Sequence, residues 1–381
     1  MGESAVQDNN ATIYEGTFLS LNNDSSLNNV SDGVIERFEN DPYLLPHWVL
    51  GLYFGFILIG SIADVIYVLA LSRCKRNGTF SLLLQLTAVD AVSPVLAMIE
   101  ILTINNQTWI FSHNLCPMYN GTEILVNSLQ LWIIICINFH VISLWNLFKY
   151  ESKRTKNPLV SCDDESNECL VTKRESTRVI SIDYRRRKVD ISVVIPSILI
   201  WFFCISLSIP SYTLSSSVKV KDNYVVCALL GSYYIQMFQI LLLVFRVLLP
   251  IPLLLFSLIF LILKLSKTSL KDVKQILTKD FGELRVLLIF CICLTILYLA
   301  TSFQRSLIHF WQINSQGFYS DITERFNVSS LYNNHLNISN NMSLTMLHYS
   351  CNTLRCALLL YLLPKFKEVL NNRVLSCHKI V

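Results

Sequence analysis

The sequence has 381 residues, of which 52% are hydrophobic and only 15% are charged, and its mean hydropathy is +0.46. A soluble domain of this size would carry more charge, and the apolar residues form blocks longer than a soluble core helix needs. The net charge of +4 could suggest a nucleic-acid partner, but the basic residues lie in loops between the apolar blocks, so we expect no such partner. Composition therefore predicts a polytopic membrane protein.

Taken in order, the chain predicts three parts. Residues 1–46 are polar and lack the basic start and apolar run of a signal peptide, so we expect an extracellular tail that the first spanning helix carries across the membrane. Residues 47–364 predict an all-α bundle of seven transmembrane helices, and 365–381 predict a short amphipathic eighth helix and a cytoplasmic tail. The expected helices span roughly 48–72, 80–104, 117–148, 190–212, 226–264, 284–311 and 343–363.

Two patterns predict the orientation. Lys and Arg concentrate in the loops 73–79, 149–189 and 264–285 and after residue 363, which places these segments in the cytoplasm and the N-terminus outside. Acceptor triplets for N-glycosylation follow the same division, because all but that of Asn77 fall on the opposite side. Those on the predicted outer side are Asn10, Asn23, Asn29, Asn106, Asn120, Asn327, Asn337 and Asn341.

The predicted third helix carries a polar stripe. Glu123, Asn127 and Gln130 lie at intervals of four and three residues, so they share one helical face. A polar face in a lipid-spanning helix must point at a protein interior or a water-filled cavity. We therefore expect this helix to be the central one.

Cysteine usage predicts one disulfide. Of the twelve cysteines, Cys116 and Cys227 are the two on the predicted oxidising side, where free thiols seldom remain unpaired. Cys377 lies in the predicted cytoplasmic tail and is a candidate for palmitoylation.

From residue 48 to 375 the chain resembles the rhodopsin-like G-protein-coupled receptors. The resemblance rests on the outside N-terminus, the seven helices, the Cys116–Cys227 pair, and several short motifs in family order. Asp90 ends LQLTAVD, Trp201 matches the fourth-helix tryptophan, and LLPKFKEVL is similar to the amphipathic eighth helix. Pro250 or Pro252 stands for the fifth-helix proline.

Three signalling motifs of that family are absent. The third-helix DRY triplet reads His140, Val141 and Ile142, and NPxxY is also replaced. Tyr298 stands in place of the CWxP tryptophan and Ala300 in place of its proline, which predicts a straighter, stiffer sixth helix. The resemblance thus implies a divergent member with weak or pH-dependent G-protein activation, since His140 is the nearest titratable stand-in for the missing arginine.

Mid-membrane charges form a second predicted group. By the resemblance, Asp64, Asp90 and Arg355 occupy positions that meet within the bundle, where a lone charge is costly. We expect Arg355 to lie between the two carboxylates and to take the place of the bound sodium ion of related receptors. Such a cluster is consistent with a purely structural role and with a switching role alike.

The resemblance also suggests a ligand site in the outer half. Candidate residues are Glu100, Glu123, Asn127, Arg246, Tyr298 and Arg305. Two acids near one cavity would attract an amine or a peptide Lys or Arg. The alternative is that Arg246 or Arg305 neutralises one acid within the protein.

Three function classes fit these observations to different degrees. The first is a plasma-membrane receptor for an extracellular ligand, with a heterotrimeric G protein as possible partner and the lipid bilayer around it. The second is a receptor-like protein that does not activate G proteins efficiently, and the third is a channel or transporter such as the insect chemosensory channels, which needs an inside N-terminus. We expect no enzyme, cofactor or metal site, because the sequence has no HExxH motif and no Gly-rich phosphate loop.

Overall fold

The computed structural model describes residues 45–72, 78–156, 192–221, 224–229, 232–266, 279–304, 306 and 335–362. The chain divides into two compact units, Met1–Tyr43 and Leu44–Val381, and the described residues all belong to the second. The predicted tail sites Asn10, Asn23 and Asn29, the loop site Asn327, Arg305, the eighth helix and Cys377 lie outside the described residues.

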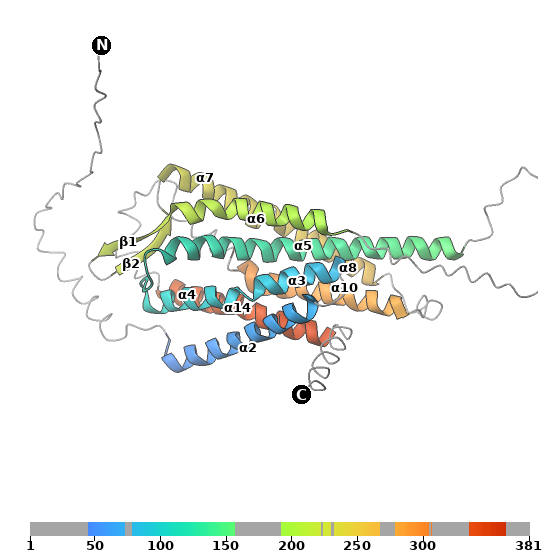
Figure 1. The fold of residues 1–381 in the computed structure, drawn as a ribbon, viewed down its shortest axis with the longest axis horizontal. Helices are drawn as coiled ribbons and strands as arrows, with labels where there is room; N and C mark the ends of the chain where they lie inside the picture. The colour runs from blue at the N-terminus through green and yellow to red at the C-terminus, as the bar shows by residue number, and fades with distance from the viewer. Residues whose placement is uncertain are drawn as a thin grey trace, which may run out of the picture. The chain divides into compact units, whose positions relative to one another are not determined.

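Helices make up most of this unit (Figure 1). In chain order they are α2 (His47–Ser72), α3 (Gly78–Asp90), α4 (Ser93–Asn106), α5 (Leu115–Lys156), α6 (Val194–Leu214), α7 (Ser232–Leu243), α8 (Pro250–Ser266), α10 (Lys279–Tyr298) and α14 (His335–Leu362). Two π-helical turns, η1 (Val244–Leu248) and η2 (Leu299–Phe303), continue α7 and α10. Two strands, β1 (Ser215–Lys221) and β2 (Tyr224–Leu229), form a hairpin that the all-α prediction did not include.

Six helical segments in the described part of the chain are long and apolar enough to cross a membrane. They are His47–Ser72, Gly78–Asn106, Leu115–Lys149, Val194–Leu214, Met237–Ser266 and Leu284–Phe303, and they correspond to the first six predicted spans. The seventh predicted span forms α14, which is long enough but carries polar residues such as His348, Asn352 and Arg355. These three side chains are buried, so α14 turns its polar face into the bundle.

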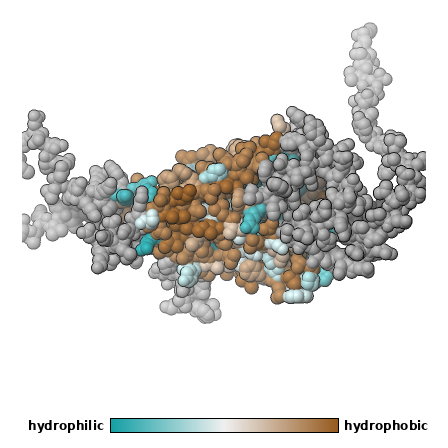
Figure 2. All heavy atoms as spheres, turned by 180° about the vertical axis from the view of Figure 1, so that it is seen from behind, coloured by the Kyte–Doolittle hydropathy of each residue, from teal (hydrophilic) through white to brown (hydrophobic). Residues whose placement is uncertain are grey.

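Hydrophobic side chains cover the outside of the bundle. Leu52, Ile59 and Leu69 of α2 and Ile198 and Phe202 of α6 are more than half exposed. Figure 2 shows such side chains as a broad, nearly continuous area on one face of the helices. An apolar surface of this extent is unfavourable in water and suits the lipid tails of a bilayer.

The central position of α5 agrees with its polar stripe. This helix packs against α3, α4, α6, α8 and α10, and Figure 1 shows it running between α6 and the α3, α4 and α14 group. Its membrane-spanning segment is 56% buried, the same share as for the α3–α4 span and twice the 28% of α2 and of α6. Its contacts with five other helices place α5 at the centre of the bundle.

One predicted helix boundary is wrong, and one predicted helix is interrupted. The fifth span was expected to start at residue 226, but residues 224–229 form strand β2 and the helix begins at Ser232. The strand pairing of this segment overrides its apolar composition, because Val225 and Val226 pair with Lys219 and Val218 of β1. The second span is interrupted at Ala91 and Val92, just before α4 begins at Ser93 with Pro94 in its first turn.

The sixth span is not the regular helix that the loss of its proline predicted. A π-helical turn, η2, begins directly after Tyr298 and includes Ala300. A π-turn adds a residue to the helical turn and shifts the register of the side chains that follow it. A second π-turn, η1, lies just before Pro250 in the fifth span.

The hairpin is fastened to one end of the bundle. Its strands are antiparallel, and Cys227 of β2 forms a disulfide with Cys116 in the first turn of α5, which confirms the predicted bridge. Trp109, in the loop before α5, donates its backbone N–H to the Val225 carbonyl at 2.7 Å. The disulfide thus joins the hairpin to α5, and the hydrogen bond joins it to the α4–α5 loop.

Candidate functional site in the bundle interior

Polar side chains of α5 lie at three levels of the bundle interior. Glu123 and Asn127 are nearest the disulfide end, Gln130 follows about one turn further along, and Asn138 lies about two turns beyond Gln130. Asn127, Gln130 and Asn138 are buried, as the polar stripe predicts for the first two. Each level joins α5 to different neighbouring helices through hydrogen bonds.

The first level is a hydrogen-bonded chain of Arg246, Glu123, Asn127, His348 and Ser302, which we call the His348 chain. Arg246 lies 3.5 Å from the Glu123 carboxylate, and Asn127 donates its amide N–H to the same carboxylate oxygen. His348 Nε2 lies 3.1 Å from Asn127 Oδ1, and His348 Nδ1 lies 2.9 Å from Ser302 Oγ. The chain thus joins η1, α5, α14 and η2.

The polarity of this chain fixes the histidine tautomer. Asn127 directs its NH₂ group at the carboxylate, so its carbonyl oxygen faces the imidazole. His348 Nε2 must therefore carry a hydrogen, and in the neutral ring Nδ1 accepts the hydrogen of the Ser302 hydroxyl. Every hydrogen-bond donor along the His348 chain faces an acceptor. A buried polar network is stable only when its groups are satisfied in this way.

A neighbouring contact joins α4 and α14. Glu100 of α4 accepts a hydrogen bond from the Tyr349 hydroxyl at 2.7 Å and a longer one from Thr345 at 3.4 Å. Both donors belong to α14. Glu100 and Glu123 are therefore both engaged by the protein itself.

These contacts change the view of the predicted ligand residues. Glu123 pairs with Arg246, as the internal-neutralisation alternative required, and Asn127 bridges Glu123 and His348. Tyr298 is buried at the end of α10, immediately before η2. Only Arg305, among the candidates, lies outside the described residues.

The second level is the Arg355 cluster, formed by Asp64, Asp90, Gln130, Asn352 and Arg355. Arg355 Nη2 lies 3.0 Å from Asp90 Oδ1, and Gln130 donates to the same oxygen at 2.9 Å. Arg355 also donates to Asn352 Oδ1, which sits one turn earlier on α14. The side chains of Arg355 and Asp90 are only 3% and 2% exposed, so this ion pair is fully buried.

Asp64 does not share Arg355 in the predicted way. Its Oδ1 accepts a hydrogen bond from the Cys356 thiol at 2.7 Å, whereas the direct partner of Arg355 is Asp90. Among the described residues, Asp64 Oδ2 and Arg355 Nε and Nη1 have no hydrogen-bond partner. Asp90 lies on α3 and Asp64 on α2, so the Arg355 guanidinium forms its ion pair with α3 and not with α2.

The triplet in place of DRY lies inside the bundle. His140 is 6% exposed, and Val141 is fully buried within the hydrophobic core. Ile142 is partly buried against the same core. Position 141 thus carries an apolar side chain that packs in the hydrophobic core.

Three predicted glycosylation positions lie within the helices α5 and α14. Asn120 donates its amide to Ser215 at 3.1 Å and to the Cys227 sulfur at 3.3 Å, so this asparagine is bound by the protein and is a poor glycan acceptor. Asn337 and Asn341 lie in the first two turns of α14 rather than in a loop.

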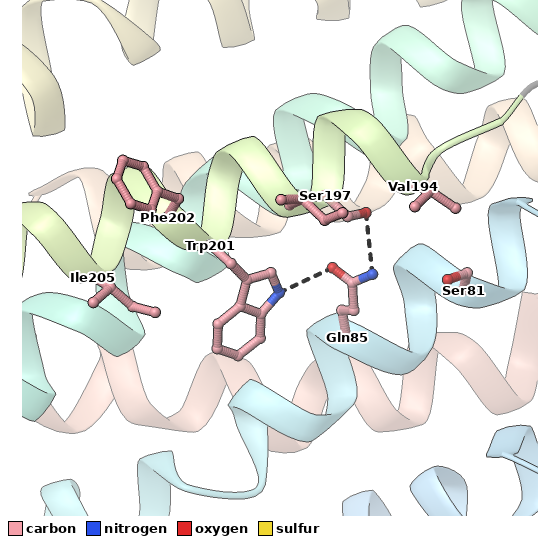
Figure 3. A pocket seen from close by; sticks show the side chains of 8 residues that line it. Ser81, Gln85, Val194, Ser197, Trp201, Phe202 and Ile205 are labelled. Atoms are coloured by element: carbon pink, nitrogen blue, oxygen red, sulfur yellow. Dashed lines mark hydrogen bonds between the residues drawn. The ribbon is translucent and has the colours of Figure 1, made fainter.

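A surface groove of about 500 Å³ lies between α3 and α6 (Figure 3). Gln85 crosses its floor, donating to Ser197 at 3.1 Å and accepting from the Trp201 indole at 3.2 Å. Val194, Ile198 and Phe202 line its rim and are mostly exposed. The groove therefore faces the lipid side, near the end of α6 that is remote from the hairpin, and it is separate from the ligand residues predicted above.

Sequence reasoning missed several members of the interior network. His348, Ser302 and Asn352 were not predicted, nor were Asn138, Ser257 and Thr295 of the third level. One signal was available, because polar residues recur at three- and four-residue intervals in α14, at His348, Asn352 and Arg355. The hydroxyls of Ser302, Ser257 and Thr295 gave no signal, since serine and threonine are common in membrane helices.

The fold and the interior network define a helical, multi-pass membrane protein with a disulfide-bonded hairpin at one end. Searches against models of known protein families and against curated proteins found no match to this chain.

Proposed function

We propose that the chain is a seven-helix receptor of the plasma membrane, similar to the rhodopsin-like G-protein-coupled receptors, with α14 as its seventh span. In this proposal the hairpin and the N-terminus lie outside the cell. The observation that carries it is the position of the His348 chain, in which side chains of four helical segments converge near the disulfide-tethered hairpin. A ligand arriving from that side would meet groups from several helices at once, which is what couples binding to helix movement.

The favoured ligand is an amine or a peptide with a cationic group. Its partner would be Glu123, whose bond to Arg246 is long at 3.5 Å and whose side chain is 17% exposed. Binding would then exchange one cation for another at Glu123 and release Arg246 on the π-turn η1. Because the released charge must find water or another partner, this exchange favours a site open to the outside.

A second candidate is a receptor-like protein that binds its ligand without activating a G protein. The specific observation in its favour is Val141, which is fully buried where related receptors carry the arginine that contacts the G protein. A lost charge-assisted contact is worth about 1.5–3 kcal/mol, or roughly tenfold or more in coupling.

Two measurements test the proposal. Glycosidase treatment of the expressed protein should reduce its mass, and changing Asn10, Asn23 and Asn29 to Gln should remove much of that shift; an unglycosylated tail that resists external protease would reject the orientation. Nucleotide exchange by purified protein on a panel of G proteins at pH 6 and 7.5 should be weak. Strong exchange at both pH values would contradict the weak coupling, and none at either would favour the second candidate.

A further inference from the structure

The third polar level of α5 is a small group at Asn138. Its amide nitrogen donates to Ser257 Oγ of α8 at 3.0 Å and to Thr295 Oγ1 of α10 at 2.9 Å. All three residues are fully buried. We call Asn138, Ser257 and Thr295 the Asn138 clamp, because one side chain holds two other helices.

The donor and the acceptor of each hydrogen bond in the clamp are fixed. Ser257 donates its own hydrogen to the Leu254 carbonyl, and Thr295 donates to the Cys291 carbonyl, both at 2.8 Å. Each hydroxyl can therefore only accept from Asn138, and the two amide hydrogens of Asn138 are both used. Rotating or withdrawing either α8 or α10 would leave an amide hydrogen unpaired in an apolar interior, which is costly.

The same side chain also has an unused acceptor. Among the described residues, Asn138 Oδ1 is buried without a hydrogen-bond partner. An orphan carbonyl oxygen of this kind destabilises the present arrangement relative to one in which a donor or water reaches it. Asn138 therefore forms two hydrogen bonds and leaves one oxygen unpaired. The unpaired oxygen offsets part of the stabilisation from the two bonds, so the free energy that holds α8 and α10 against α5 here is small.

The helices held by the clamp are also the ones that reach the His348 chain. Arg246 of η1 lies 11 positions before Ser257, about 16 Å along the helix, and Ser302 of η2 lies seven positions after Thr295, about 10 Å. In both cases a π-turn carries the member of the His348 chain. A change of register at a π-turn rotates the helix beyond it, so the two levels are mechanically linked.

We propose that the Asn138 clamp holds α8 and α10 against α5 in the resting protein, and that movement at the His348 chain opens it. Its role in signalling rests on the proposed receptor function, whereas its role in holding the helices together does not.

The test uses Cys291, a fully buried thiol on α10 one turn from Thr295. Full-length protein in lipid nanodiscs, carrying Cys293→Ser to simplify the peptide, would be treated with methyl methanethiosulfonate, and labelling of Cys291 would be followed by mass spectrometry. Because each interhelical hydrogen bond in a membrane contributes modestly, Asn138→Leu should accelerate labelling about five- to tenfold. Thr295→Val and Ser257→Ala, which each remove one bond, should accelerate it about two- to threefold.

The matched control is Asn105→Leu, the same substitution at a buried asparagine of α4 that accepts the Leu45 N–H and does not contact the clamp. Labelling in this variant should stay within twofold of the parent. An Asn138→Leu rate equal to the parent, or an equal acceleration by Asn105→Leu, would overturn the proposal. If Asn138→Leu does not fold, unchanged labelling in both single-bond variants would overturn it as well.

Nucleotide exchange separates this inference from the proposed function. Faster labelling with raised basal exchange in Asn138→Leu supports the clamp and the receptor together. Faster labelling without any exchange on the G-protein panel supports the clamp as a helix lock and counts against G-protein coupling. Unchanged labelling rejects the clamp whatever the exchange assay gives.

Discussion

The Arg355 cluster and the His348 chain each contain one arginine paired with one acid, yet their surroundings differ. The Arg355–Asp90 pair is 3.0 Å long and almost completely buried, and the Arg246–Glu123 pair is 3.5 Å long with side chains 19% and 17% exposed. A buried charge that loses its partner has no water to turn to, whereas a partly exposed one does. The comparison suggests that the first pair holds the bundle together and the second is available for exchange.

The sharpest test of this difference is Arg355→Ala. It leaves Asp90 buried without its cation, so we expect a loss of about 3–5 kcal/mol in the free energy of unfolding. Thermal unfolding of the purified protein and its surface expression would measure the loss. The matched control is Arg246→Ala, the same substitution in the partly exposed pair, and equal destabilisation by the two would contradict the comparison.

A double variant separates charge from packing in the same cluster. Arg355→Ala with Asp90→Asn removes both charges and keeps an amide that Gln130 can still contact, so much of the stability should return. Asp64→Asn should rescue Arg355→Ala less well, because Asp64 bonds Cys356 and not Arg355. The opposite order of rescue would show that Asp64 is the true partner.

We expect the next largest loss of stability when the disulfide is broken at the end of the bundle near the His348 chain. Cys116→Ser and Cys227→Ser should each cost about 2–4 kcal/mol and reduce surface expression to a similar extent. The double variant should be no worse than either single one, since the two cysteines form one bond. Additive losses would mean that the cysteines act separately.

The helices α2 and α14 pack closely beside the Arg355 cluster. A Cβ at Gly60 of α2 would collide with Thr353 of α14, two residues before Arg355. Gly60→Ala should therefore destabilise the protein by about 1–3 kcal/mol in thermal unfolding. Gly51→Ala and Gly55→Ala, on the same helix with open space around them, are the controls and should be neutral or slightly stabilising.

The smallest effect is expected at the partly exposed Arg246–Glu123 pair. Glu123→Gln keeps the size of the side chain and a hydrogen-bonding oxygen but removes the charge, so thermal unfolding should change by less than about 1 kcal/mol. In a screen of amines and of peptides containing Lys or Arg, the same variant should lose binding of any cationic ligand. A loss of stability as large as that of Arg355→Ala would show that Glu123 holds the bundle together instead of being available to a ligand.

The sequence predicted the α5 stripe and the disulfide more accurately than the pairing of charges. Glu123, Asn127 and Gln130 could be assigned to one interior face because helical spacing alone determines which residues share a face. The partners could not be assigned, because Gln130 and Asn352 are 222 residues apart and meet only through the packing of α5 against α14. The sequence likewise left open whether Arg246 or Arg305 neutralises one of the two acids, and the structure places Arg246, on the π-turn η1, beside Glu123.

Length, hydropathy and cysteine position therefore determined by themselves that this is a multi-pass helical membrane protein with a Cys116–Cys227 bridge, because lipid accepts only long apolar helices and an oxidising environment pairs exposed thiols. The tertiary structure decided the hairpin, the π-turns after Leu243 and Tyr298, and the three polar levels of α5. These features depend on how each helix is rotated against its neighbours. That rotation depends on packing and hydrogen bonds between helices far apart in the sequence, so no single segment of the sequence encodes it.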